Sequence, residues 1–291
     1  MKLKKPIADL QVHGWTSWET GMCEFPVKIL EPGKRTLLEV LKFTQTAFPK
    51  KDAMMAMTNF DDTRYEGLIN TRNAFSASDV YDDYKDRYVG VSRKGNKLIV
   101  IRGQEIATNL GHVVVLLGNR NISSRNFEVV AKQAKDMGAF VMADHPLEAR
   151  GAVGRLFNKA INKGGNLSLG EDNLRRYRAD INGLEIEGYI SKEHFKQIMD
   201  LAKELEIEVY AGSDSHYVAY GNRKGMFSSY TTFNEIDATN PATLLADLRK
   251  PVKGYNERQR PCEGLIHPAL VIYNTLRFKT HLMNRQDVLI N

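Results

Sequence analysis

Six residues with metal-binding side chains stand at the ends of apolar, strand-like runs in this chain. They are His13, Glu105, His112, His145, Asp214 and His216. Imidazole nitrogens and a bridging carboxylate can hold divalent ions side by side, where the ions activate a water and screen the phosphoryl oxygens of a phosphate ester. The pattern therefore predicts a metallohydrolase.

The composition restricts both the class of protein and the kind of metal site. The chain has 291 residues, of which 42% are hydrophobic and 26% are charged, so one domain of barrel size is expected. No apolar run approaches the roughly 20 residues of a membrane helix, and the basic start lacks a signal-peptide core, so we expect a cytoplasmic protein without a membrane partner. Only Cys23 and Cys262 are present, so histidines and carboxylates must hold any metal.

Basic residues are concentrated towards the C-terminal end. The net charge is +6, and residues 249–291 contain eight Lys and Arg against three Asp and Glu. A basic surface can concentrate an anionic substrate such as a nucleotide, a nucleic acid or a phosphorylated metabolite. A solvated surface that merely happens to be basic is the alternative, and the sequence leaves both open, as it does the oligomeric state.

Seven apolar runs are predicted to form strands. They span residues 7–13, 53–58, 97–107, 112–117, 138–144, 183–189 and 207–212. Helical periodicity lies between several of them, at 37–43, at 123–137 with Ser123 as its cap, and at 191–205. Strands that alternate with helices are typical of an α/β fold with a mainly parallel sheet, either a barrel or a doubly wound sheet.

The positions of polar residues favour the barrel. Barrel enzymes build their sites at the carboxyl ends of the strands. His112 begins its run instead, as the return limb of a hairpin would. The ligand-type residues that stand where predicted strands end are His13, Asn59, Glu105, His145 and Asp214.

Two segments are expected to lie apart from the regular alternation. Residues 148–180, rich in Gly, Asn and Arg, predict a long excursion over one face of the molecule. The barrel is expected to span residues 1–235. Residues 236–291 then form a C-terminal extension that begins with a turn-rich stretch around Asn240-Pro241, continues as a helix and packs on the barrel.

In their order and spacing, the motifs resemble those of the PHP (polymerase and histidinol phosphatase) superfamily, over roughly residues 7–235. The usual Asp-Leu-His-x-His run stands as Asp9 to His13, and the usual Thr-Asp-His stands as Thr58-Asn59-Phe60. The resemblance implies an irregular (β/α)7 TIM-like barrel with a trinuclear metal centre. The other motifs are intact: Gly-x-Glu at 103–105, Gly-His at 111–112, His-Pro at 145–146 and Gly-Ser-Asp-x-His at 212–216.

The departures from the family pattern cluster around one of the three metals. Gln11 replaces a histidine and offers only an amide oxygen, and Phe60 replaces another and offers no ligand. His216 is retained and Glu19 stands near a further ligand position. The resemblance thus implies two divalent ions, Mn²⁺, Zn²⁺ or Fe²⁺, with a third position only partly provided.

The resemblance also implies how the ligands are shared. One ion takes His13, Glu105 and Asp214, with Gln11 as an additional ligand. The other takes His112 and His145, and Glu105 bridges the two ions. His216, whose ordinary pKa is near neutrality, then contacts the phosphate or protonates the leaving oxygen.

Three arginines follow these motifs and suit phosphate oxygens, Arg64, Arg120 and Arg150. Arg150, just past the His-Pro motif, is the preferred contact by its position, although an arginine at any of these three places is more often a surface ion-pair partner than a ligand contact.

Two functions remain open from the sequence. The first is a divalent-metal-dependent phosphoesterase that acts on a nucleotide, a nucleic-acid end or a small phosphomonoester. The second is a degenerate, non-catalytic barrel that serves as a binding or structural module, for which Gln11 and Phe60 argue. The enzyme is favoured, because a decaying site would lose ligands indiscriminately and not around one metal.

Overall fold

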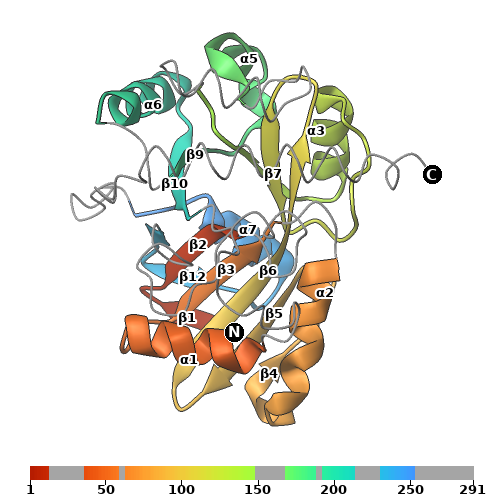
Figure 1. Ribbon diagram of the computed structural model, residues 1–291, viewed down its shortest axis with the longest axis vertical. Coiled ribbons are helices and arrows are strands. Elements are labelled where there is room, and N and C mark those ends of the chain that lie inside the picture. Colours follow the sequence, from red (N-terminus) through yellow and green to blue (C-terminus); the bar gives the residue numbers. More distant parts are fainter. Residues whose placement is uncertain (13–35, 59–62, 148–167, 188–191, 214–229, 253–291) are drawn as a thin grey trace, which may run out of the picture.

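The computed structural model describes residues 1–12, 36–58, 63–147, 168–187, 192–213 and 230–252. It shows a mixed α/β fold in which helices surround a curved sheet with the strand order β10-β9-β8-β7-β6-β3-β2-β11 (Figure 1). Each of the seven predicted runs coincides with a strand to within two residues. The strands are β2 (Ile7–Val12), β3 (Ala53–Met57), β6 (Asn96–Ala107), β7 (His112–Leu116), β8 (Phe140–Ala143), β9 (Gly183–Glu187), β10 (Glu208–Gly212) and β11 (Thr231–Thr232).

The sheet is mixed and not mainly parallel as predicted, because four of its neighbouring pairs are parallel and five are antiparallel. β2, β3 and β6 run parallel, and so do β8, β9 and β10. β7 is antiparallel to both β6 and β8, because it returns from β6 through the short connection 108–111. The hairpin predicted at His112 is therefore confirmed, and it breaks the regular alternation of strand and helix.

Six helices are described, and three of them are the predicted ones. They are α1 (Leu37–Ala47), α2 (Thr63–Ile69), α3 (Phe127–Asp136), α5 (Gly170–Arg176), α6 (Lys192–Leu205) and α7 (Pro241–Leu248). The cap of α3 is Asn126, not the predicted Ser123, because the Asn126 Oδ1 accepts a hydrogen bond from the Val129 N–H at 3.1 Å.

α7 begins in a stretch that the sequence analysis expected to be rich in turns. Asn240 caps this helix, with its Oδ1 accepting from the Thr243 N–H at 2.9 Å, and Pro241 occupies the first helical position. Proline suits that position because its missing N–H would have no partner within the helix. Leu244 and Leu248 of α7 are buried against the barrel interior.

Shorter elements complete the described part of the chain. β1 (Lys2–Lys4) pairs with β12 (Glu235–Asp237), and the hairpin β4 (Val80–Tyr81) and β5 (Tyr88–Arg93) extends from β6. The 3-10 turns are η2 (Asn70–Ala74), η3 (Ala77–Asp79) and η4 (Arg178–Asp180). In the described part of the chain, no helix combines the length and the apolar character needed to cross a bilayer.

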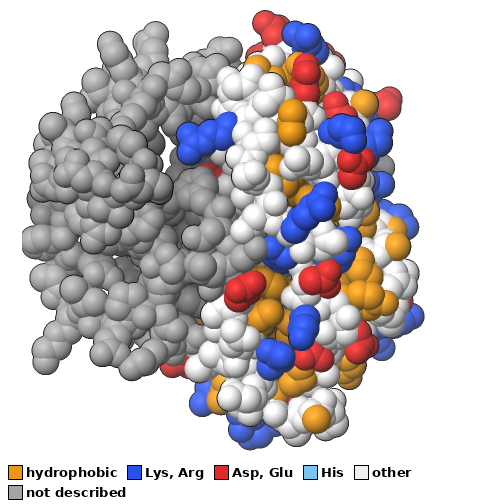
Figure 2. Space-filling view, turned by 90° about the vertical axis from the view of Figure 1, so that its right-hand side faces the viewer, with side chains coloured by type: hydrophobic (Ala, Val, Ile, Leu, Met, Phe, Trp, Pro, Cys, Tyr) orange, Lys and Arg blue, Asp and Glu red, His pale blue; other side chains and the backbone are white. Residues whose placement is uncertain are grey.

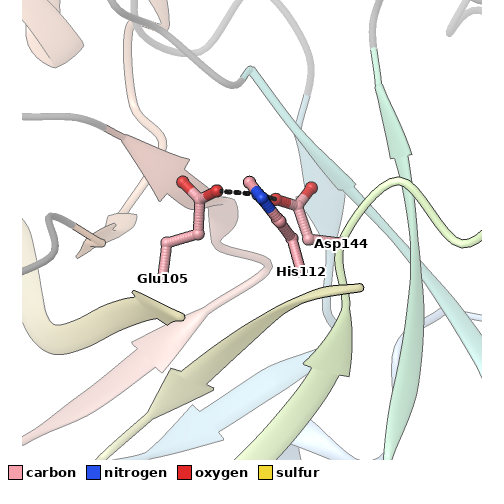
Figure 3. Close-up of side chains that lie close together, drawn as sticks. All are labelled: Glu105, His112 and Asp144. Atoms are coloured by element: carbon pink, nitrogen blue, oxygen red, sulfur yellow. Dashed lines mark hydrogen bonds and ion pairs between the residues drawn. The ribbon is translucent and has the colours of Figure 1, made fainter. Parts of the chain in front are cut away.

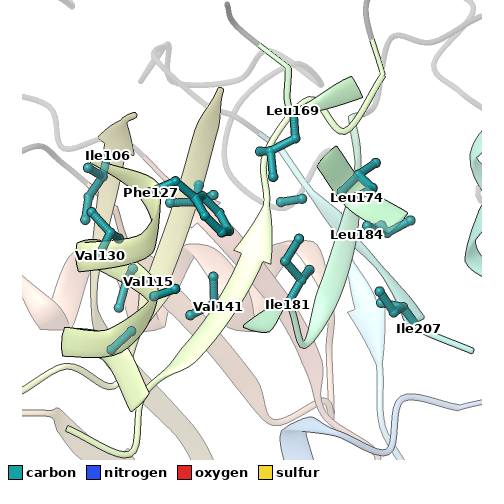
Figure 4. Close-up of a cluster of buried hydrophobic side chains, with 14 of the residues drawn as sticks. Ile106, Val115, Phe127, Val130, Val141, Leu169, Leu174, Ile181, Leu184 and Ile207 are labelled. Atoms are coloured by element: carbon teal, nitrogen blue, oxygen red, sulfur yellow. The ribbon is translucent and has the colours of Figure 1, made fainter. Parts of the chain in front are cut away.

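Alternate side chains along the strands pack into separate layers. Leu10, Ile101 and Met142 belong to the cluster that fills the barrel interior. α3, α5 and α6 cover the outer faces of β7 to β10 through a cluster that includes Phe127 and Leu184 (Figure 4). α1 and α2 cover β2, β3 and β6 in the same way, in the lower half of Figure 1.

The sheet curls until β10 lies beside β2, so that the barrel is nearly closed. Side chains join the two ends. The Asp9 Oδ1 accepts a hydrogen bond from the Ser213 N–H at 2.9 Å, and the Thr231 Oγ1 accepts one from the Ala211 N–H at 2.8 Å. Asp9, Ser213 and Thr231 are all buried. These bonds hold the end of β10 against β2.

Candidate metal centre

Three polar residues converge at the end of the barrel because of the register of β6, β7 and β8. Ala107 pairs with His112 and Glu105 with Val114, so Glu105 and His112 lie diagonally opposite on one face of the hairpin. Asp144 directly follows β8, and its N–H donates a hydrogen bond to the His112 carbonyl oxygen at 3.2 Å. Figure 3 shows the three side chains pointing towards one another.

The geometry of this group is that of a candidate cation site. The His112 Nδ1 lies 2.6 Å from the Glu105 Oε1 and 4.0 Å from the Asp144 Oδ2. One ligand atom from each residue falls within 4.8 Å of the others. Glu105 is 5% exposed, His112 8% and Asp144 0%. Buried carboxylates are expected to be paired or to coordinate a metal, and these donors fit a divalent ion.

His145 stands at the edge of the same group. Its Nδ1 lies 3.3 Å from the Asp144 Oδ1, and its ring centroid lies 6.3 Å from that of His112. Its side chain is 23% exposed, so it is more accessible than the three buried residues. Its backbone has φ +44°, a conformation that non-glycine residues rarely adopt.

Gln11 lies in the same end of the barrel, on β2. The pairing of β2 with β3 shifts between Asp9 and Val12, which opposes an extra residue of β2 to β3, as in a β-bulge. Gln11 is fully buried, and its Oε1 and Nε2 have no hydrogen-bond partner among the described residues. The bulge thus directs a polar side chain into a buried position.

The structure brings together some of the predicted site residues. Of the predicted ligands, Glu105 and His112 lie in one group with Asp144, and His145 contacts Asp144 at the edge of that group. Arg120 is exposed and follows the end of β7 opposite to His112, and the side chain of Arg64 is not among those described. The other predicted site residues, His13, Glu19, Arg150, Asp214 and His216, lie outside the described residues.

Sequence reasoning missed two buried carboxylates, Asp144 and Glu185. Asp144 stands in the Ala-Asp-His-Pro run, in which only His145 was predicted to be a ligand. Glu185 lies within β9 and is fully buried. Its neighbours Leu184 and Ile186 pack in the outer layer, so Glu185 faces the interior. The sequence signal for Glu185 was a charged residue inside an apolar run, which indicates a buried charge.

No protein-family model and no curated protein matches this chain. Among solved structures, the chain is similar to a crystal structure of a protein from Bifidobacterium adolescentis that is described as a "putative metal-dependent phosphoesterase". The sequence identity is 11%, the match covers 87% of this chain and 98% of the other, and the TM-score is 0.45.

Proposed function

We propose that the chain is a divalent-metal-dependent phosphoesterase built on a divergent (β/α)7 barrel of the PHP type. The observation that carries the proposal is the buried group of Glu105, His112 and Asp144 at one end of the barrel. Two carboxylates and an imidazole, buried together in a barrel, suit catalytic metal binding better than a purely structural role. The motif resemblance over 7–235 agrees with this assignment.

The residues of the site would divide the work as follows. Glu105 orients the His112 imidazole through the contact between Oε1 and Nδ1, and Asp144 supplies a second carboxylate. A divalent ion held there supplies Lewis-acid polarisation of phosphoryl oxygens and makes water a better nucleophile. His145 lies where it can contact the phosphate or exchange a proton with it. His216, Asp214 and Arg150 keep their proposed roles as acid, ligand and phosphate contact.

The donor set bears on the choice of metal. Two of the three donors are carboxylates, which suit Mn²⁺ or Fe²⁺ as well as Mg²⁺, whereas Zn²⁺ prefers sites richer in nitrogen and sulfur. We therefore propose Mn²⁺ or Fe²⁺ ahead of Zn²⁺. The proposed substrate is an anionic phosphate ester of a nucleotide, a nucleic-acid end or a small metabolite.

The test is product release from nucleotides, phosphomonoesters and short single-stranded DNA and RNA, with Mn²⁺, Mg²⁺ or Zn²⁺. Asp144→Asn and Glu105→Gln should each lower the metal-dependent turnover by at least about 100-fold, because even residues behind metal ligands cost 10- to 100-fold when removed. Glu204→Gln is the control, since this carboxylate is exposed on α6 and pairs with Arg175 at 2.7 Å. Its turnover should match that of the wild type.

A non-catalytic barrel is the second candidate, which the Gln11 amide in place of a histidine favours. In that case the folded wild type would release no product with any metal. Metal-dependent thermal stabilisation of such an inactive protein would identify a binding module. If the metals produced neither stabilisation nor turnover, the proposed metal site would be wrong.

A further inference from the structure

A cluster of lysines lies at the amino ends of β2, β3 and β6. These strands are parallel neighbours, with Ile7 paired to Ala53 and Ala53 paired to Leu98, so the residues that precede each of the three lie side by side. The only acidic residue in the segments 4–6, 50–52 and 95–97 is Asp52. The lysine cluster consists of Lys4, Lys5, Lys50, Lys51 and Lys97.

Hydrogen bonds tie the three segments together without neutralising the lysines. The Asp52 Oδ2 accepts a hydrogen bond from the Lys4 backbone N–H at 2.9 Å, and the Lys97 Nζ donates one to the Lys2 carbonyl oxygen at 2.6 Å. Three exposed members have no carboxylate partner in the described part of the chain, Lys5, Lys50 and Lys51. The lysine cluster therefore presents an excess of positive charge to solvent.

The backbone at two of these lysines indicates independently that their charge is used. Lys5 has φ +46° and Lys50 has φ +65°, in the left-handed region where glycine and asparagine are the favoured residues. Lysine lacks the short polar side chain with which asparagine stabilises this conformation locally. A lysine at both turns therefore costs stability, and residues held at such a cost cluster at functional sites.

The lysine cluster is remote from the candidate metal centre. Leu98 and Glu105 lie seven positions apart on the same strand, β6, which corresponds to about 23 Å along an extended strand. A molecule bound at the lysine cluster would thus not occupy the space around Glu105 and His112. The lysine cluster is a surface separate from the proposed site of reaction.

The arrangement of the charges fits a phosphate backbone. Adjacent strands are about 4.8 Å apart, so the lysine cluster extends over roughly 10 Å, which spans several phosphates of a duplex. The large hydrophobic side chains that are exposed in the described part of the chain lie outside these segments, so base stacking and insertion into a bilayer lack an anchor here. They are Phe43, Tyr81 and Val129.

We propose that the lysine cluster binds the phosphate backbone of double-stranded nucleic acid, at the end of the barrel opposite to the candidate metal centre. Contacts to phosphates fix position but carry no sequence information, so the binding is independent of sequence and depends steeply on salt. The inference does not rest on the proposed function, because the lysine cluster needs no metal ion.

The test measures binding of a mixed-sequence DNA duplex to the full chain by fluorescence anisotropy at several salt concentrations, with EDTA present. Changing Lys5 and Lys50 together to asparagine should weaken binding at least about 10-fold at roughly 50 mM salt. The slope of log K against log salt should decrease by about 0.9 for each phosphate contact that is lost. The melting temperature should stay the same or rise, because asparagine suits the left-handed backbone, and this separates lost binding from unfolding.

Two double variants are the controls. Arginine at positions 5 and 50 keeps the charge and should keep the affinity. Lys196→Gln with Lys203→Gln removes the same charge from exposed positions of α6 and should leave the slope unchanged. A wild-type slope in the asparagine variant, or an equal loss in the α6 variant, would overturn the assignment. So would a wild type that binds vesicles of phosphatidylserine and phosphatidylcholine but not the duplex.

Discussion

At the scale of single residues, the backbone of His145 is the feature that stands out. Its φ of +44° places it in the left-handed region, beside the fully buried Asp144. Such a conformation costs a non-glycine residue about 1–2 kcal/mol. Residues held this way cluster at functional sites, where the surrounding structure maintains them. The imidazole of His145 is thus held beside Asp144 at a cost in stability.

We therefore expect His145→Asn to raise the free energy of unfolding by up to about 1 kcal/mol, because asparagine tolerates this backbone conformation better than histidine. The metal-dependent turnover should fall by at least about 10-fold, since the imidazole is removed. Denaturant unfolding of the metal-free protein and steady-state kinetics measure the two effects.

Lys94→Asn is the matched control. Lys94 also has a positive φ, +54°, in the turn between β5 and β6, and Gly95 follows it at +80°. An Asn-Gly turn suits such a hairpin, so this variant should gain similar stability with no change in turnover. If the His145 variant and the wild type have equal turnover, His145 takes no part in the reaction.

The residues of the site were predictable to different degrees. Glu105 and His112 could be predicted, because each stands in a motif at the end of an apolar run. Glu185 was not predicted, although a charged residue in an apolar run was a signal, since its strand is buried on both faces and periodicity does not tell which face becomes the barrel interior. Asp144 could have been predicted from its place in the Ala-Asp-His-Pro motif. Its closeness to Glu105, however, depends on the register of β6, β7 and β8, which is known only from the folded sheet.

At the scale of elements, the junction of β2 and β10 is made by side chains. Asp9 holds the Ser213 N–H, and the Ser213 Oγ donates in turn to the Gln11 carbonyl oxygen at 3.4 Å. These contacts lie at the point where the chain leaves β10 towards Asp214. The closure of the barrel thus involves Ser213, the residue that directly precedes the predicted ligand Asp214 in the sequence.

We expect Asp9→Ala to weaken Mn²⁺ binding at least about 10-fold and to lower the free energy of unfolding by about 1.5–3 kcal/mol, as for loss of a hydrogen bond to a charged group. Thr231→Val is the matched control, because it removes the neighbouring bond to the Ala211 N–H. Thr231→Val should lower stability and leave Mn²⁺ affinity unchanged. Calorimetric titration and thermal unfolding compare them. If Asp9→Ala binds Mn²⁺ as tightly as Thr231→Val, the hydrogen bonds that close the barrel do not affect the metal site.

Most elements of the barrel were predictable because an apolar run of strand length is a local signal that needs no knowledge of the folded structure. The β5 strand was not predicted, although Lys94-Gly95 marks the turn after it. Its apolar and polar residues alternate only weakly, and charged residues flank the strand in the sequence. α7 was misread because Asn-Pro favours turns and helix starts alike, and only the apolar residues after it distinguish the two. The antiparallel direction of β7 could be predicted only together with β6, with which it forms a hairpin.

At the scale of the whole molecule, charge is unevenly distributed along the chain. Basic and acidic side chains are interspersed over the described part of the face in Figure 2. Residues 253–291 carry six Lys and Arg against three Asp and Glu. A truncation after Val252 preserves α7 and the hydrogen bond from the Val252 N–H to the Thr232 carbonyl oxygen at 3.0 Å. That boundary suits a test of the C-terminal charge.

Removing 253–291 should weaken binding of single-stranded DNA and flatten its salt dependence, if those residues bind phosphates. The slope of log K against log salt should decrease by about 0.7 for each phosphate that is no longer neutralised. Fluorescence anisotropy at several salt concentrations measures it. The full chain with the six basic residues changed to glutamine is the control, and it should behave like the truncated chain. An unchanged slope in both would leave the basic segment without a role in substrate binding.

The pairing of β1 with β12 has a consequence for synthesis on the ribosome. Lys2 pairs with Asp237, and Ala8 of β2 pairs with Thr231, so these early strands wait for nearly the last described ones. Until then the nascent chain exposes the unpaired edge of β2. Barrel closure is therefore expected to be a late and slow event, completed only after Asp237 has left the exit tunnel.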